Sequence, residues 1–413
     1  MTELAQRDAD EVRSLASLAF RELGDAAAGL YGFHRAIAER AFGASGPGAL
    51  PARALHDAIS GRAYRAVGGC FRVAGAIADT ALEGRRVEDG RALSSSPRGA
   101  LLLGALTGLI GDRLEREGSD LHQPLAARVG GRVVEPDADG LAAAYPTATP
   151  GLVVFVHGLM ESEFAWRVGG RPDTYGSRLR ADLGLTPVEL RYNTGRHISE
   201  NGLELADLLE RLVAGWPVDV ERIALVGHSM GGLVARSACH QAAERGDDWV
   251  GQVRHIVSLG SPHLGAPLAQ GVHWASAALH ALPETRPLAG VLRRRSAGIR
   301  DLRQGSLVDA DWRDCDPDAL RAEACEEVPL LDGATHCFVA ATITADPRHP
   351  VGRLIGDWLV LETSASGRGR TRRIPFETEH GLVLGGTHHI ALLNHPAVYE
   401  RLRDWLSAEL PGR

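Results

Sequence analysis

The sequence predicts an α/β fold in which a largely parallel sheet is covered by helices. One observation is a β-branched, apolar run at 223–226 that stops at Gly227 and is followed, after a short turn, by a helical pattern over 233–243. Another is the alternation of strand and helix patterns on both sides of this unit, which predicts right-handed crossovers. The length of 413 residues exceeds one average domain, so we expect one large domain and an additional part.

Residues 121–413 are expected to form the main domain. Runs that are apolar on both faces, such as 152–156, suit central strands of a parallel sheet. The alternation stops at about 264–335, where helical pieces and an acidic loop predict a cap insertion that shapes a pocket. The expected strands are 127–134 as a hairpin, 152–156, 187–192, 223–226, 253–259, 337–344 and 372–376, and the expected helices are 141–144, 175–183, 203–213, 233–243 and 397–406.

Residues 1–120 are predicted to form a helical N-terminal extension. Apolar residues recur there at helical spacing near 12–23, 52–82 and 101–114, and no catalytic signature accompanies them. Two interpretations stay open. The segment is either an appendage packed against the main domain or an amphipathic region that contacts lipid or a partner chain at a membrane surface.

Composition excludes several classes of function. The formal net charge of −7 offers no footprint for nucleic acid. No signal peptide is visible, and the longest apolar stretch, 99–111, is too short to cross a bilayer, so we expect a cytoplasmic protein, with peripheral membrane association left open. The five cysteines lack zinc-site spacing, and we expect neither a metal nor a cofactor. The oligomeric state is not indicated.

The pattern Gly-x-Ser-x-Gly, from Gly227 to Gly231, joins the strand pattern at 223–226 to the following helix. A Ser on such a turn is presented at the carboxyl edge of the sheet. The two glycines let the strand and the helix approach each other without a Cβ clash. We therefore expect Ser229 to be a nucleophile and the N–H group of Met230 to stabilise a developing oxyanion.

A Ser nucleophile needs a His that takes its proton and an acid that orients this His. In an architecture of this kind, the order along the chain is Ser, acid, His. Asp357 follows a late strand and fits the acid, with Asp346 as the main alternative. The base is expected in the loop before the last helix, where His388 and His389 are adjacent and only one of them can point at Ser229.

A second oxyanion donor is expected in the loop after the strand 152–156, which begins with His157, Gly158 and Leu159. Gly158 permits a tight turn, and Leu159 would supply the backbone N–H group.

Five short motifs carry a resemblance to a known superfamily. They are His-Gly-Leu-Met (157–160), Gly-His-Ser-Met-Gly-Gly-Leu-Val-Ala-Arg (227–236), Gly-Ser-Pro-His-Leu-Gly-Ala-Pro (260–267), Gly-Asp-Trp-Leu-Val (356–360) and His-His-Ile-Ala-Leu-Leu (388–393). Together they resemble the α/β-hydrolase superfamily, and within it the bacterial lipases and esterases and the related GPI inositol-deacylase-like hydrolases. The resemblance covers about 125–410 and gives no family for the first 120 residues.

In such lipases an Asp-Gly-x-Val motif supplies the acid, and a His before an aliphatic residue supplies the base. The resemblance therefore implies Asp357 and His389, with Leu159 and Met230 as oxyanion donors. The sequence departs from the family by having Trp358 where Gly is usual. It also shows no acidic cluster that would imply the structural calcium site of some of these lipases.

These features predict a serine hydrolase that cleaves a small-molecule ester or lipid through an acyl-serine intermediate. Deacylation of a lipid-linked glycan and acyl transfer to an alcohol are alternatives that would use the same triad. A non-catalytic binding protein with this fold is the remaining alternative, and loss of a triad member would be its signature.

Overall fold

The computed structural model describes residues 93–169, 171–266, 296–315, 325–369 and 372–407, together with Ser14, Leu18 and Ala54. The chain divides into two compact units. The first contains Met1–Ser96, Glu117–Leu121 and Gly271–Arg295, and the second contains Pro97–Arg116, His122–Gln270 and Ser296–Arg413.

Most of the first unit lies outside the described residues. Within it the structure describes a 3₁₀ turn, η2 (Leu93–Ser95), and a hydrogen bond of 3.0 Å from Ser14 Oγ to Asp120 Oδ2. The helical segments expected before residue 93 are therefore outside the described part of the chain, and the N-terminal extension stays a prediction.

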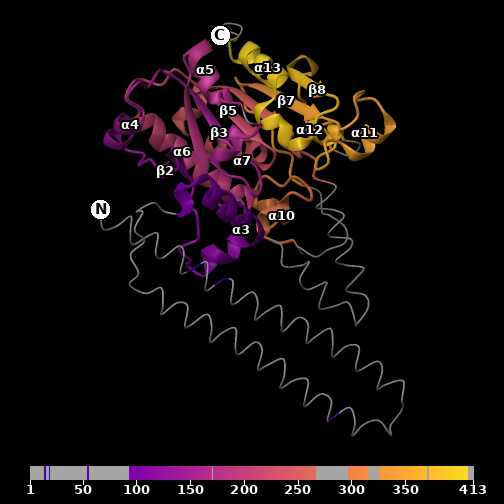
Figure 1. Ribbon diagram of the computed structural model, residues 1–413, viewed down its shortest axis with the longest axis horizontal. Coiled ribbons are helices and arrows are strands. Elements are labelled where there is room, and N and C mark those ends of the chain that lie inside the picture. Colours follow the sequence, from indigo (N-terminus) through magenta and orange to yellow (C-terminus); the bar gives the residue numbers. More distant parts are fainter. Residues whose placement is uncertain are drawn as a thin grey trace. The chain divides into compact units, whose positions relative to one another are not determined.

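The second unit is built on an eight-stranded sheet with the order β2-β1-β4-β3-β5-β6-β7-β8 (Figure 1). The pairs β1–β2 and β1–β4 are antiparallel, and all other neighbours are parallel, which confirms the predicted sheet type. The strands are β1 (Ala126–Val129), β2 (Arg132–Val133), β3 (Gly151–Val156), β4 (Thr186–Arg191), β5 (Arg222–His228), β6 (Val253–Leu259), β7 (Thr335–Ala341) and β8 (Gly381–Leu384).

Helices cover both faces of the sheet (Figure 1). Every residue of β3 is buried, because successive side chains pack against helices on opposite faces. Val154 belongs to a core with α4 (Ala138–Ala144), α6 (Ile198–Gly215) and α7 (Met230–Arg245). Phe155 belongs to a second core with α5 (Tyr175–Leu183) and α13 (Pro396–Ser407).

The helix boundaries follow from local chemistry. Thr174 and Ser177 form a capping box at the start of α5, so that side chains satisfy backbone N–H groups that lack an intrahelical partner. The helices α5 and α7 each end at a glycine, Gly184 and Gly246, in the left-handed conformation. These signals set the start of α5 and the ends of α5 and α7, the helices that connect β3 to β4 and β5 to β6.

The expected strand at 372–376 is wrong. This segment makes one isolated bridge, between Arg368 and Arg373, and the last strand is β8. Pro375 has no N–H group to donate to a ladder, which disfavours a central strand there.

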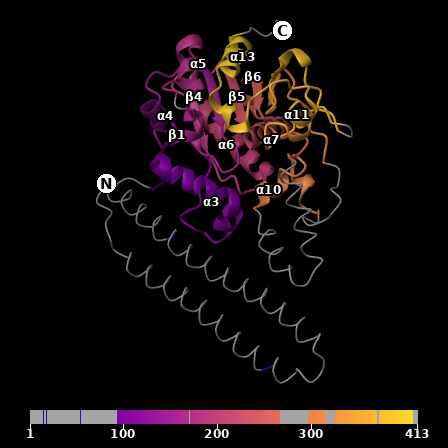
Figure 2. The ribbon, with the colours of Figure 1, turned by 45° about the vertical axis from the view of Figure 1, so that its right-hand side comes forward.

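The predicted cap is described in part. Its residues 267–295 and 316–324 lie outside the described part of the chain, and those described include α10 (Ala297–Asp301) and η5 (Asp309–Asp311). The helix α10 lies beside α3 (Pro97–Arg116), where Ser296 Oγ donates a hydrogen bond of 2.6 Å to the Gly108 carbonyl (Figure 2). The remaining described helices are α11 (Pro350–Ile355) and α12 (Glu362–Ala365).

The helix α3 falls within the predicted N-terminal extension, whereas in the structure it belongs to the compact unit that holds the sheet. Its small residues face that unit. A Cβ atom at Gly104 would lie 2.6 Å from the Glu161 carbonyl oxygen, and one at Gly108 would lie 2.3 Å from Met160 Cγ. The glycines therefore allow α3 to contact the loop that follows β3. No described helix combines the length and apolar character that crossing a membrane requires.

Candidate active site

Ser229 lies on the turn between β5 and α7, with φ 51° and ψ −120°. A non-glycine residue in this region is strained, and such strain is typical of functional turns. A Cβ atom at Gly227 would lie 2.3 Å from Gly232 N, and one at Gly231 would lie 2.1 Å from Val156 O. The residues 227–231, which we call the elbow, therefore adopt this path only with glycine at both ends.

Asp357 and His389 form a buried pair in which His389 Nδ1 lies 2.7 Å from Asp357 Oδ2. The two residues are 1% and 3% exposed. The other carboxylate oxygen, Oδ1, accepts the N–H groups of Leu359 at 3.0 Å and Val360 at 2.8 Å, and the His389 N–H group donates to the Asp357 carbonyl at 3.0 Å. Two backbone N–H groups thus hold Oδ1 of Asp357, while Oδ2 faces the imidazole.

The alternative acid and base lie at the surface in capping roles. Asp346 is exposed, and its Oδ1 accepts the N–H group of Arg348 at 2.8 Å. His388 is exposed, and its Nδ1 accepts the N–H group of Ala391 at the start of η7 (His389–Asn394). The structure pairs His389 with Asp357 and leaves His388 and Asp346 outside that pair.

Ser229 and His389 both border the end of β6. The Ser229 N–H group donates to the Leu259 carbonyl at 2.8 Å. The next residue, Gly260, has a φ of 61°, and a Cβ atom there would lie 3.1 Å from His389 Cε1. A Cβ atom at Gly158 would lie 3.0 Å from Ser229 Cβ. The ends of β3, β5 and β6 thus converge with His389 around the Ser, as carboxyl edges of parallel strands do.

The loop 157–162, which we call the oxyanion loop, follows β3. The Gly158 N–H group donates to Glu161 Oε2 at 2.7 Å, and the Met160 N–H group donates to Thr194 Oγ1 at 3.2 Å. Met160 has a φ of 62°, so the loop is bent sharply. The two expected donors differ in setting, because Leu159 is half-buried on this loop while Met230 is the first residue of α7, where the N–H group has no intrahelical partner.

His157, the first residue of this loop, is buried and packs against Tyr192. Its ring stacks on Tyr192 with 4.5 Å between centroids, and the Tyr192 hydroxyl donates to the His157 carbonyl at 2.7 Å. Burial lowers the pKa of His157 to about 4. His157 is therefore a neutral packing group at the start of the oxyanion loop.

Sequence reasoning missed Glu161 and treated His228 as a packing or surface group. The structure joins them, with 2.9 Å between His228 Nδ1 and Glu161 Oε1. No spacing rule signals this contact, because the two residues are 67 positions apart and meet only through the sheet.

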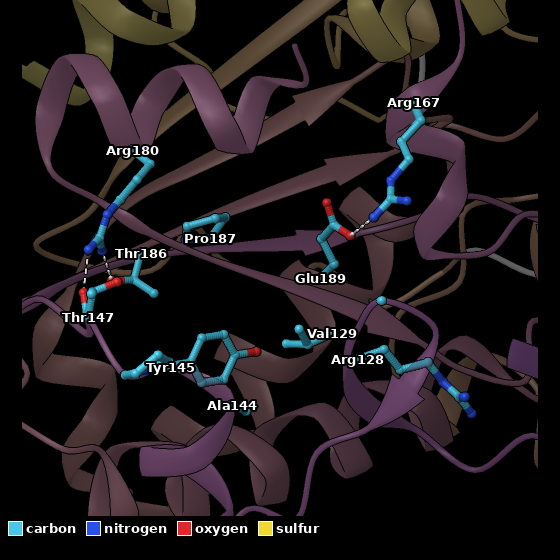
Figure 3. A pocket seen from close by; sticks show the side chains of 12 residues that line it. Arg128, Val129, Ala144, Tyr145, Thr147, Arg167, Arg180, Thr186, Pro187 and Glu189 are labelled. Carbon is cyan, nitrogen blue, oxygen red and sulfur yellow. Dashed lines mark hydrogen bonds and ion pairs between the residues drawn. The ribbon is translucent and has the colours of Figure 1, made fainter. Parts of the chain in front are cut away.

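A pocket of about 310 Å³ lies away from this site, at the edge formed by β1 and β4 (Figure 3). Glu189 lines it, and burial raises the pKa of this carboxyl to about 7, against the opposing charge of Arg167 at 4.0 Å. None of the lining residues belongs to the elbow or the oxyanion loop.

Within the described ranges, Glu377, Glu379 and His380 are close enough to share a cation. Both carboxylates are exposed, and the three residues belong to none of the loops around Ser229.

The sheet order and the Ser on the turn after β5 define the α/β-hydrolase fold, and the resemblance drawn from the motifs is confirmed at this level. Within that fold, residues 194–282 match a family described as "PGAP1-like alpha/beta domain". This segment contains the elbow and β6. No curated protein sequence matches the chain at a significant level.

Solved structures with similar folds include enzymes that act on esters and thioesters. A thioesterase from the prodiginine pathway of Streptomyces coelicolor is 21% identical and covers 64% of this chain and 92% of its own, with a TM-score of 0.32. An esterase of Pyrobaculum calidifontis is 16% identical, with coverages of 62% and 77% and a TM-score of 0.36. Naproxen esterase from Bacillus subtilis is 16% identical, with coverages of 63% and 84% and a TM-score of 0.34. Similarity of this size carries no argument about substrate.

Proposed function

We propose that the protein is a serine hydrolase that cleaves carboxylic esters through an acyl-Ser229 intermediate. The observation that carries the proposal is the buried Asp357–His389 pair beside a Ser in strained elbow geometry. A surface Ser or a structural His would need neither the strain nor the buried carboxylate.

In the proposed reaction His389 takes the Ser229 hydroxyl proton while Oγ attacks the ester carbonyl carbon. The carbonyl oxygen becomes an oxyanion that the N–H groups of Leu159 and Met230 stabilise. The leaving alcohol takes the proton from His389, and an acyl-enzyme remains. Water then gives a proton to His389 and attacks the acyl carbon, and Ser229 recovers its proton as the acid leaves. Asp357 orients the imidazole and stabilises its charged form.

The first test is Ser229→Ala, measured with p-nitrophenyl esters of increasing acyl length and with a fluorophosphonate label. We expect a loss of about 10⁴-fold to 10⁶-fold in kcat and no labelling. Wild-type protein that neither labels nor turns over any ester would overturn the proposal and favour a binding role for the fold.

The acid and the base have matched controls in the same segments. Asp357→Asn is expected to lower kcat by about 10⁴-fold, as loss of the orienting acid does in triads. Asp346→Asn and His388→Ala should leave kcat near the wild-type value, because both side chains cap turns at the surface. A large loss in either control would reassign the acid or the base.

A lipid-linked glycan ester is a second candidate substrate. The match of residues 194–282 to the PGAP1-like domain, together with the motif resemblance to GPI inositol-deacylase-like hydrolases, supports it. Release of fatty acid from an acylated inositol glycolipid, compared with release from a simple triglyceride or p-nitrophenyl ester, would separate the two substrates. Transfer of the acyl group to an added alcohol would identify acyl transfer.

The domain division and the membrane contact of the N-terminal helices are also proposals. Two truncations test them, one that begins at residue 97 and keeps α3, and one that begins at residue 121. We expect the first to fold with full esterase activity and the second to lose activity, because α3 contacts the oxyanion loop. Equal binding of full-length and 97–413 protein to lipid vesicles would argue against an anchor before α3.

A further inference from the structure

A pair of ionisable side chains joins the elbow to the oxyanion loop. His228, the last residue of β5, is fully buried, and the side chain of Glu161 is 13% exposed. His228 Nδ1 lies 2.9 Å from Glu161 Oε1 and 3.1 Å from Oε2. The His228 ring centroid is 4.7 Å from that of His389, so this pair adjoins the proposed base.

The hydrogen-bond partners of His228 indicate which of its ring nitrogens carry a proton. Its Nδ1 faces the Glu161 carboxylate, and its Nε2 faces the His389 carbonyl at 3.3 Å. The His389 carbonyl and an ionised Glu161 carboxylate both accept hydrogen bonds, so with Glu161 ionised both ring nitrogens donate, and only the imidazolium has two N–H groups. Burial alone would lower the pKa of His228, but the charge and the hydrogen bond of Glu161 raise it above its usual value. Burial likewise opposes ionisation of Glu161, but His228 brings the pKa of that carboxyl below its usual value.

The other contacts of this pair reach the catalytic loops. Glu161 Oε2 accepts the Gly158 N–H group at 2.7 Å. This hydrogen bond holds the peptide between residues 157 and 158, which directly precedes the peptide that carries the Leu159 N–H group. A Cβ atom at Gly158 would lie 3.1 Å from both Glu161 Oε2 and His228 Nδ1, so the loop approaches the pair as closely as glycine allows. Through Nε2, His228 holds the backbone of His389.

We propose that Glu161 and His228 form a buried ion pair that positions the Leu159 N–H group for the oxyanion and sets the upper pH limit of activity. This inference rests on the proposed esterase function. Both residues are positioning residues, because they act through Gly158 and His389 and do not touch the substrate.

Other groups around His228 leave the sign of the effect unchanged. On the base side, the charge of Asp357 raises the pKa of His228 further. Trp166, in η3 (Glu163–Arg167), faces the ring edge-on at 6.4 Å and carries no charge. The proton is therefore bound below the raised pKa, and the ion pair is lost as the pH rises through that value. Activity should fall on the alkaline side as the oxyanion loop loses its anchor.

The test is Glu161→Gln, with Ser229 labelling and the pH profile of kcat as readouts. Without the carboxylate, burial favours neutral His228, so the pair is lost at neutral pH. We expect kcat to fall by about 100-fold with little change in KM, as loss of one oxyanion donor does. The alkaline limb of the profile should move to lower pH. A merely structural role would lower thermal stability and leave both the profile and kcat of the folded protein unchanged.

Two further variants help to interpret the result for Glu161→Gln. His228→Gln retains a donor to Glu161 without a titrating ring, so we expect a smaller loss in kcat and no alkaline limb from this pair. Glu189→Gln, which removes a half-buried carboxyl outside the site (Figure 3), should leave kcat and its pH profile unchanged.

The results separate two failures. If the wild-type protein is active and the Glu161→Gln variant keeps the wild-type kcat and pH profile, the positioning role is overturned. The esterase proposal then still stands. If wild-type protein neither labels nor hydrolyses esters, both proposals fall together.

Discussion

The elbow and the oxyanion loop meet at Ser229, but they are held in different ways. The elbow is kept in place by its own glycines, with Gly227 against Gly232 and Gly231 against the β3 backbone. The oxyanion loop is held by its own Glu161 side chain, which contacts His228 of the elbow, and by Thr194 and α3 from elsewhere in the chain.

This difference has a physical basis. A turn fixed by excluded Cβ volume needs glycines at set positions, so it leaves a short motif in the sequence. A loop fixed by hydrogen bonds to distant groups leaves no such motif, because its partners need only be near in space. We therefore expect substitutions of the elbow glycines to act on folding and substitutions of the groups that hold the oxyanion loop to act on catalysis.

Among the substitutions that test this comparison, Gly231→Ala is expected to have the largest effect. A Cβ atom there would lie 2.1 Å from the Val156 carbonyl oxygen and 2.6 Å from that of His157, and neither backbone can yield easily. We expect the free energy of unfolding to fall by about 3 kcal/mol, measured by chemical denaturation. Gly251→Ala, at a glycine with open space around it, should change the free energy of unfolding by less than about 0.5 kcal/mol. Equal stability of the two variants would show that the elbow is not fixed by close approach.

An intermediate effect is expected for Gly104→Ala on α3. The added Cβ atom would lie 2.6 Å from the Glu161 carbonyl and 3.0 Å from that of Met160, so it would displace the oxyanion loop. We expect kcat for ester hydrolysis to fall by about tenfold, with a smaller effect on stability than at Gly231, because misplaced catalytic groups cost rate. Leu109→Ala, at an exposed position of α3, is the control. Unchanged kcat in Gly104→Ala would mean that α3 does not hold the loop.

The smallest expected effect is that of Trp358→Gly. Trp358 has a φ of 89°, a region that favours glycine, and its side chain is 63% exposed. Relief of this strain should raise the free energy of unfolding by about 0.5 to 1 kcal/mol and leave kcat unchanged. Trp358→Ala removes the side chain but keeps the strain, so it should give no such gain. If Trp358→Ala raised the free energy of unfolding as much as Trp358→Gly, the destabilisation would come from the Trp side chain and not from the backbone.

At Trp358, the departure from the lipase motif can be compared with the backbone conformation. The lipases that the motifs resemble have glycine at this position, and residue 358 of this chain has a positive φ, a region that favours glycine. The departure affects a solvent-exposed side chain, and it leaves the contact between Asp357 and His389 intact at 2.7 Å.

The sequence by itself determined the sheet type, the strand-to-helix unit at Ser229 and the loops that contain Asp357 and His389. These follow from apolar periodicity and from glycines at fixed spacing, which act over a few residues. It did not determine the end of the sheet, where the segment 372–376 suggested a strand and β8 forms later.

Only the tertiary structure decided which distant groups support the site. Asp357 and His389 are 32 positions apart, and Glu161 and His228 are 67 apart, so each contact exists only once the parallel strands are in register. The contact of α3 with the oxyanion loop is likewise a tertiary contact, although this helix falls within the predicted N-terminal extension. Periodicity reports the face that a segment buries, whereas the identity of its partner depends on how the whole chain packs.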